Sequence, residues 1–260
     1  MNFVPLDVIP LWLFFILATA VCVAAVEFGY RFGKSRHILS VKEKDEPVAA
    51  MVAALLGLVA FMLAFTFSMA ASRFDARRQA VMEEANVIGT TYLRTRLLPE
   101  PERSECADLL RQYTILRVDA IPKHKVTELL QRSEEIHEKL WTRAVAVAER
   151  APASIPTGLF LQSLNETIDY HGKRVYVGLE SRIPFTIWIA MFIITLLGMI
   201  SIGYQSGLAG TPRSPEILVL AVAFAGVLLL NVDLDRAHEG LLQVSQQPMI
   251  DVLRTMPEPK

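Results

Sequence analysis

The sequence is poor in cysteine, carries almost no net charge and lacks the short motifs of catalysis. Its two cysteines, Cys22 and Cys106, are too few for a disulfide framework, and neither lies in a metal-ligand pattern. The net charge of −1 comes without a basic stripe for phosphates, which excludes a nucleic-acid-binding protein. No glycine-rich phosphate loop, nucleophile elbow or HExxH motif occurs. We therefore expect neither an enzyme nor a cofactor.

Metal-binding patterns are equally scarce. Glu134 and His137 form one half of the motif of carboxylate-bridged di-iron bundles, which needs two such pairs and two further glutamates. We expect this pair to lie on a solvated charged face, and we expect no metal site. His171, close in sequence to Asp169 and Glu166, is expected to be an ordinary surface or packing residue.

Charge is absent from four long stretches of the chain. Of the 26 basic and 27 acidic residues, 33 lie between Arg73 and Arg182. The uncharged stretches are Val8 to Val26, Val48 to Ser72, Ile183 to Pro212 and Ile217 to Val232. A bilayer core takes about 20 helical residues, so these stretches predict four transmembrane helices, the last continuing past Asp233. No charge stands near the middle of a span, which argues against a proton-coupled carrier.

The charged part of the chain has helical periodicity and almost no strand character. We therefore predict an all-α membrane protein with a helical extramembrane domain inserted between the second and third transmembrane helices. The predicted segments are transmembrane helices at 8–27, 48–72, 183–203 and 216–234, a short charged loop at 28–47, the helical domain at 73–182, a loop at 204–215 and a C-terminal tail at 235–260. No helix-breaking residue separates Ala71 from Leu97 or Thr157 from Arg182, so the second and third transmembrane helices are expected to continue into the domain as unbroken rods.

Two features of the second transmembrane helix predict that the chain associates with copies of itself. Small residues on one face allow a neighbouring helix to approach closely, and an apolar heptad-like pattern follows them. The expected contact residues are Ala53, Gly57, Ala60 and Ala64 in the membrane, and Phe74, Val81 and Ile88 beyond it.

A second face of the same helix has the chemistry of a pore wall. At 100° per residue, five side chains fall within about 40° of one line. They are Phe61, Phe65, Ser68, Ser72 and Asp75. This order is the one expected along a pore: aromatic side chains that expel water come first, hydroxyl groups follow, and a circle of charged side chains lies at the mouth. The alternative is that the phenylalanines face lipid and the serines bond carbonyls of their own helix.

Charged residues at the membrane edge form the second candidate set. An unpaired carboxylate in hydrocarbon costs a few kcal/mol, so pairing is expected. The carboxylates are Glu27, Asp233 and Asp235, and the expected partners are Arg73, Arg77, Arg78 and Arg236. The set is either a structural ion-pair network or an ion-coordinating site. The arginines have a further possible role, which is to bind anionic membrane lipids.

Several phrases of the sequence resemble a bacterial family of membrane proteins called DUF4239, whose members are described as bestrophin-like. They are Ala64 to Arg78, Glu84 to Arg94, Leu164 to Asp169 and Asp233 to Arg236. The resemblance implies a homopentameric anion channel with four transmembrane helices, a hydrophobic neck on the second helix and a cytosolic helical domain. Animal bestrophins also carry an acidic calcium-binding run after the last helix. Here only Asp233 and Asp235 stand in that place, so calcium gating is not implied.

The charges flanking the spans leave the orientation open. Six basic residues lie on the side of the first and third loops and seven on the side of the helical domain. On the resemblance we expect the domain and both termini in the cytoplasm and the protein in the bacterial inner membrane. The alternative to a channel is a non-conducting membrane scaffold or sensor whose helical domain recruits a protein partner.

Overall fold

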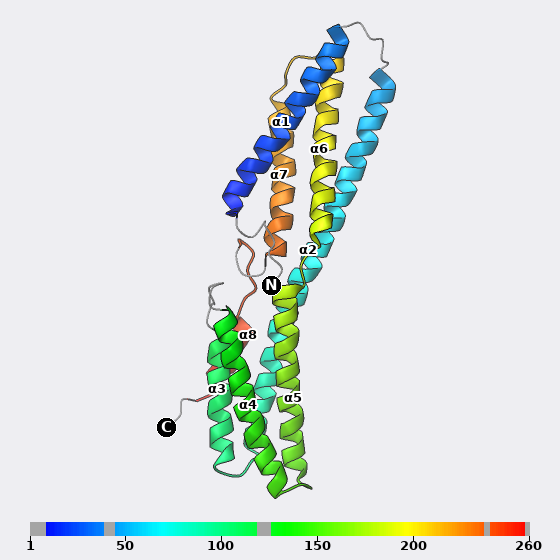
Figure 1. Ribbon diagram of the computed structural model, residues 1–260. Coiled ribbons are helices and arrows are strands. Elements are labelled where there is room, and N and C mark those ends of the chain that lie inside the picture. Colours follow the sequence, from blue (N-terminus) through cyan, green and yellow to red (C-terminus); the bar gives the residue numbers. More distant parts are fainter. Residues whose placement is uncertain (1–8, 39–44, 119–125, 237–239, 258–260) are drawn as a thin grey trace. The chain divides into compact units, whose positions relative to one another are not determined.

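The computed structural model describes residues 9–38, 45–118, 126–236 and 240–257, and every regular element in them is helical (Figure 1). This confirms the predicted all-α fold. The chain divides into two compact units. The first draws on Met1–Phe74 and Arg182–Gln243, and the second on Asp75–Ser181 and Val244–Lys260.

The first unit is built from α1 (Leu11–Ile38), the N-terminal part of α2 (Asp45–Thr95), α6 (Phe185–Leu208) and α7 (Glu216–Asp235). Each of these four helices is long and apolar enough to cross a membrane. Val59 and Leu63 of α2, Trp188 and Met191 of α6 and Leu228 of α7 belong to one buried cluster. The helices are therefore packed on one another as well as apolar.

Helices α1 and α6 cross at glycines, which permits a backbone-to-backbone contact (Figure 1). The four residues are Gly29, Gly33, Gly203 and Gly207. A Cβ atom at any of them would lie 2.0 to 2.2 Å from a carbonyl oxygen of the other helix. Two small-xxx-small pairs thus face each other, a contact that van der Waals packing favours inside a membrane.

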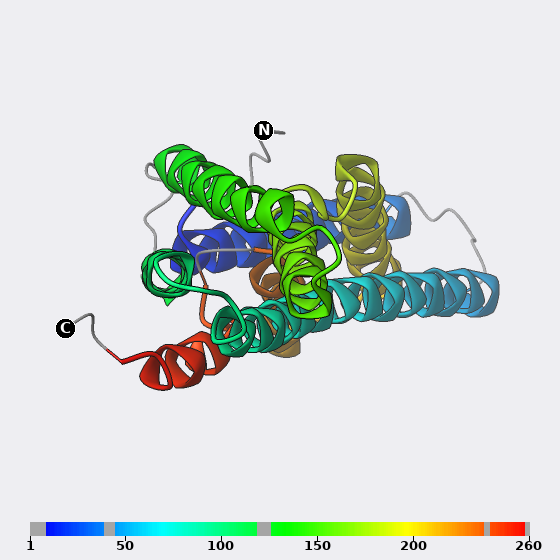
Figure 2. The same ribbon diagram turned by 90° about the horizontal axis from the view of Figure 1, so that it is seen from below.

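The second unit is a bundle of the C-terminal part of α2 with α3 (Glu102–Val118), α4 (Val126–Arg150) and α5 (Ile155–Val175), as Figure 2 shows from below. Ser154 caps α5 by accepting a hydrogen bond from the Thr157 amide. Inside the bundle, Ile88, Leu110, Leu140 and Phe160 are fully buried, one from each helix. This core holds the unit together.

The C-terminal residues contribute a further helix, α8 (Gln247–Arg254), to the second unit. The sequence predicts only a tail over residues 235–260, so this helix is a correction to that prediction. Met249 of α8 and Met256 just after it are buried in the same core as Leu110. Their burial against α3 explains why so short a helix is ordered, because packing rather than propensity stabilises short helices.

The expectation of two unbroken rods is half right. Helix α2 runs without a break for 51 residues through both units. After α5, by contrast, a π-helical turn η3 (Tyr176–Glu180) is followed by four residues outside any helix before α6. The cause is Pro184, which has no N–H and disfavours helical backbone at the residue before it. The amide of Ile183 donates instead to Asp235 Oδ1, at 3.0 Å.

The apolar heptad on α2 does not lie on a free surface. Val81 and Ile88 are buried inside the second unit, with 4% and 0% of their surface exposed, and Phe74 packs against the core of the first. The prediction that these residues mediate self-association is therefore wrong. The small residues Ala53, Gly57, Ala60 and Ala64 are exposed in the single chain, so that part of the prediction stands untested.

Replacing Gly203 by alanine should destabilise the first unit. Its methyl group would overlap the Val26 carbonyl oxygen, and α1 and α6 must move apart. We expect a loss of about 1–3 kcal/mol, the usual cost of overpacking. Thermal unfolding of the detergent-solubilised protein measures it.

Gly226→Ala is the matched control. Gly226 lies on α7, another helix of the first unit, and a Cβ atom at this position would have no neighbouring side chain or helix within 4 Å. Alanine favours helix over glycine by about 1 kcal/mol, so this variant should be as stable as the parent or more so. Equal unfolding temperatures for Gly203→Ala and the parent would contradict the close crossing.

Candidate functional site

The Phe61–Asp75 stripe, made of Phe61, Phe65, Ser68, Ser72 and Asp75, lies on an uncovered face of α2. All five side chains are exposed in the single chain. The rings of Phe61 and Phe65 are 64% and 51% exposed and stack on each other with their centroids 6.3 Å apart. An apolar surface of this kind needs lipid or a protein neighbour to cover it.

The stripe is uncovered because α2 packs on the rest of the chain through its opposite side. Val59, Leu63 and Ala70 are buried in the core of the first unit. Thr66 lies on the same side and satisfies its hydroxyl by donating to the Met62 carbonyl at 2.7 Å. The serines of the stripe are on the exposed side, where their hydroxyls can meet water or another chain.

The first membrane-edge carboxylate, Glu27, pairs with arginines other than those expected from the sequence. Its Oε1 lies 2.7 Å from Arg31 Nε, one turn along α1. Arg213, in the loop between α6 and α7, contacts both carboxylate oxygens at 3.0 and 2.7 Å. The same guanidinium stacks over the Tyr30 ring, 5.2 Å from its centroid. This network joins α1 to the loop.

The two aspartates at the end of α7 are occupied by backbone amides. Asp233 accepts hydrogen bonds from the amides of Leu241 and Leu242 at 2.8 and 3.1 Å. Asp235 accepts from the Ile183 amide and lies 3.3 Å from Arg182 Nε. Both carboxylates thus hold backbone groups of the same chain in place.

The arginines of the same set lie in different surroundings. Arg78 is exposed and Arg73 is half-buried. Arg77 is buried, and so is Arg236, which donates to the carbonyl of Ile9. Among the described residues, no three His, Cys, Asp or Glu side chains converge to hold a metal ion.

A buried ionic cluster inside the second unit was missed by the sequence analysis. Its members are Glu84 of α2, Tyr113 and Arg117 of α3, His137 of α4, and His171 and Arg174 of α5, and we call it the Glu84 centre. The Glu84 side chain is fully buried. Its Oε1 accepts from the Tyr113 hydroxyl and lies 3.1 Å from Arg117 Nε, and its Oε2 accepts from Arg174 at 2.6 Å.

The two histidines complete the centre, although both were expected at the surface or in ordinary packing. His171 Nδ1 is 3.0 Å from the Tyr113 oxygen. The His137 ring lies 4.7 Å from the Tyr113 ring and 4.9 Å from the His171 ring, centroid to centroid. Glu134 remains exposed, as predicted, but His137 points inward. The sequence did contain one sign of the Glu84 centre. Glu84 falls between Val81 and Ile88 on the apolar face of its helix, where a charged side chain needs buried partners.

Burial sets the protonation of the centre. It lowers the pKa of His137 to about 4, because a charged ring is poorly solvated there, so the ring is neutral at pH 7. Burial, together with the neighbouring Glu84 carboxylate, raises the pKa of Tyr113 well above its usual range. The phenol therefore stays protonated and donates a hydrogen bond to Glu84. With two guanidinium groups and one carboxylate, the centre holds one excess positive charge.

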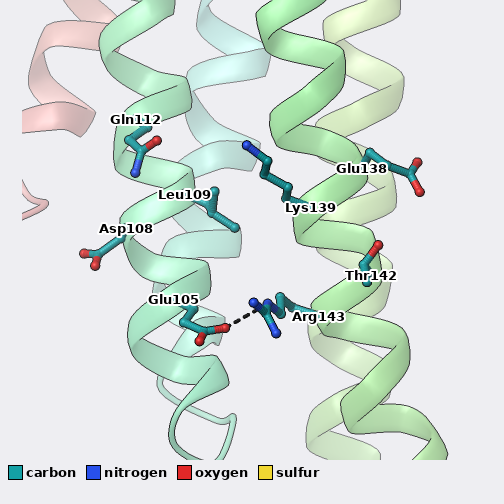
Figure 3. Close-up of a pocket in the computed structure, with 8 residues that line it drawn as sticks. All are labelled: Glu105, Asp108, Leu109, Gln112, Glu138, Lys139, Thr142 and Arg143. Atoms are coloured by element: carbon teal, nitrogen blue, oxygen red, sulfur yellow. Dashed lines mark ion pairs between the residues drawn. The ribbon is translucent and has the colours of Figure 1, made fainter.

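A groove with a volume of about 560 Å³ lies on the surface of the second unit, between α3 and α4 (Figure 3). Arg143 and Glu105 form an ion pair across it at 2.8 Å. The α3 wall contributes the acidic Glu105 and Asp108, and the α4 wall contributes Glu138, Lys139 and Arg143, so the groove carries charges of both signs.

Comparison with known proteins gives a consistent result. The family model of the bestrophin-like domain matches residues 10–249. A bacterial bestrophin homologue from Klebsiella pneumoniae, solved by zinc anomalous phasing, is 16% identical, with 94% of this chain and 96% of that chain covered and a TM-score of 0.64. Two single-residue variants of that homologue, each also 16% identical, give TM-scores of 0.66 and 0.65 over 93% and 95% of this chain and 97% of theirs. No curated protein sequence matches.

Replacing Glu84 by glutamine should strongly destabilise the second unit. The change keeps the shape of the side chain but leaves the buried Arg117 and the partly buried Arg174 without a counter-charge. Breaking a buried ion pair in this way costs about 3–5 kcal/mol. Thermal unfolding of the detergent-solubilised protein, followed by circular dichroism, measures the loss.

Glu83→Gln provides the neighbouring control. Glu83 pairs with Lys173 at 2.6 Å, but this pair is partly exposed, and such pairs contribute at most about 1 kcal/mol. If both variants lost the same small amount, the Glu84 centre would not be the ionic core of the unit.

Proposed function

The chain belongs to the bestrophin-like family, and from this membership we propose that it is an ion channel assembled from several copies of itself in a membrane. The single observation that carries the proposal is the exposed Phe61–Asp75 stripe on α2. In a ring of copies, each α2 turns this stripe towards the central axis. Its order of aromatic, hydroxyl and acidic side chains then runs along the pore.

The two phenylalanines form the neck of the proposed pore. A ring of phenyl groups expels water from a narrow passage, and a hydrated ion cannot cross until the ring widens. Ser68 and Ser72 follow with hydroxyl groups that replace part of an ion's hydration shell. Asp75 places a charge at the mouth, where it acts on the ions that enter or leave.

The finer properties of the channel follow from the family and not from particular contacts. We propose an anion preference and a pentamer on that basis. We also propose that the protein is not an enzyme and needs no cofactor, because its family consists of channels. Lipids are the expected partners of the apolar faces that the ring leaves outside.

We propose that the protein lies in the bacterial inner membrane with the second unit and both termini in the cytoplasm. The four apolar helices support a membrane location. Basic residues flank the spans on both sides, with Arg73, Arg78 and Arg182 among those on the side of the second unit, so the proposed orientation rests on the family and not on the charges.

A second candidate function is a non-conducting scaffold or sensor. The groove between α3 and α4 supports it, because neither helix is apolar enough to span a membrane and both are available to a protein partner. In that case α2 anchors the protein, and the Phe61–Asp75 stripe faces lipid or a neighbouring helix without enclosing a pore.

Replacing both Phe61 and Phe65 by alanine should produce a channel that conducts without its normal gate. The smaller side chains leave a wider passage that stays hydrated, so the open fraction in planar bilayers should rise several-fold. The single-channel current of purified protein gives the result. Mass photometry in detergent establishes that the variant assembles like the parent.

Phe67→Ala is the matched control. Phe67 is also exposed on α2, but at 100° per residue it points roughly 120° away from the stripe. It should face lipid and leave the conductance unchanged. A double variant of parental mass and parental conductance, or an equal effect of Phe67→Ala, would contradict the neck and favour the scaffold.

The orientation predicts which introduced cysteines react in intact cells. Because Cys22 and Cys106 are buried, the native protein should give little labelling of its own. A membrane-impermeant maleimide should label Ser214→Cys, in the loop between α6 and α7, in intact cells. It should label Glu135→Cys, exposed on α4, only after lysis. The reverse pattern would place the second unit in the periplasm.

A further inference from the structure

The Glu84 centre contains a pair of buried neutral histidines that the proposed pore does not use. His137 and His171 are 6% and 7% exposed, and their rings meet edge to face. The Nε2 atom of His137 has no hydrogen-bond partner within the described part of the chain. A buried ring nitrogen without a partner costs free energy, so its place beside an ionic cluster calls for an explanation.

The hydrogen bonds assign the tautomer of His171. The Tyr113 hydroxyl has a single hydrogen, which it donates to Glu84. His171 Nδ1, 3.0 Å from the same oxygen, must therefore donate to it. The lone pair of the ring is then on Nε2, which is the atom that takes up a proton in acid.

A proton on either ring would meet an environment that is already positive. The groups that face the histidines come from three helices of the bundle, α2, α3 and α5. They are Glu84 from α2, Tyr113 and Arg117 from α3, and Arg174 from α5, with the neutral Gln246 bonded to Arg174 at 2.7 Å. The single carboxylate of Glu84 balances the charge of only one of the two guanidinium groups. The positive charge of each further proton therefore has no negative charge in the centre to balance it.

We propose that uptake of protons by His137 and His171 opens the Glu84 centre and makes the second unit acid-sensitive. Each histidine takes one proton from solvent at its unprotonated ring nitrogen. The added charge repels Arg117 and Arg174, and α4 and α5 separate from α2 and α3. The proposal concerns the second unit by itself and does not rest on ion conduction.

The sign and range of the response follow from linkage. A histidine in the opened unit binds its proton with an ordinary pKa near 6.5, whereas burial lowers the pKa of His137 to about 4. Between these values the opened unit binds more protons than the closed one, so opening becomes favourable as the pH falls. For one histidine the ratio of closed to opened unit falls about tenfold per pH unit, beginning near pH 6.5 and ending near pH 4.

The two native cysteines provide the test. Cys106 is buried in the core of the second unit and Cys22 in the first. The full-length protein in detergent is treated with dithiodipyridine, which reacts with thiols in mild acid, at pH 7.5, 6.0 and 5.0. Peptide mass spectrometry measures the labelling rate at each cysteine relative to the unfolded chain at the same pH. We expect the relative rate at Cys106 to rise at least tenfold from pH 7.5 to 5.0, and that at Cys22 to stay constant.

Substitutions separate the histidines from general acid effects. His137→Gln and His171→Gln should each reduce the acid response of Cys106, and together they should abolish it. His37→Gln, which alters a histidine of α1, should leave the response intact. Arg174→Gln gives a second variant that keeps both histidines: it removes the excess charge and should weaken the acid response.

Two results would overturn the proposal. One is a Cys106 rate in the parent protein that does not depend on pH. The other is an acid response that persists in the double histidine variant. If the double variant does not fold, the parent protein and the single variants still decide the matter.

Discussion

The division of α2 into two faces is the constraint on which the rest of the structure depends. The helix is continuous for 51 residues, and one side of it is buried throughout, against α6 and α7 in the first unit and against α3, α4 and α5 in the second. The opposite side is left uncovered, and the apolar part of it needs lipid or another protein chain to cover it. The residues on that side decide what completes it.

What the sequence predicts well is whatever follows from local composition. Four spans were recognisable because lipid requires long uncharged runs, and the helices of the second unit because their apolar residues recur with a helical period. The same periodicity does not say what covers a face. Val81 and Ile88 have the spacing of an intermolecular contact, yet α3 and α5 of the same chain bury them, which only the tertiary structure reveals.

Features that join distant parts of the chain escaped prediction. Glu84 meets Arg117 and Arg174, which are 33 and 90 positions further along, and no local pattern announces such a meeting. Pro184 was visible, but its effect on the preceding helix depends on Asp235 receiving the Ile183 amide. The Phe61–Asp75 stripe, by contrast, could be recognised because its members share one helix, although its role depends on neighbours that a single chain does not contain.

The glycine crossing of α1 and α6 also bears on how the protein is made. Gly29 and Gly33 leave the ribosome about 170 residues before Gly203 and Gly207. At ordinary rates of translation the interval is on the order of ten to thirty seconds. During that time α1 lacks α6, against which it packs, while all of the second unit except α8 emerges from the ribosome. The bundle can thus begin to fold before the first unit is complete, and the close fit of α1 with α6 is among the last steps of biogenesis.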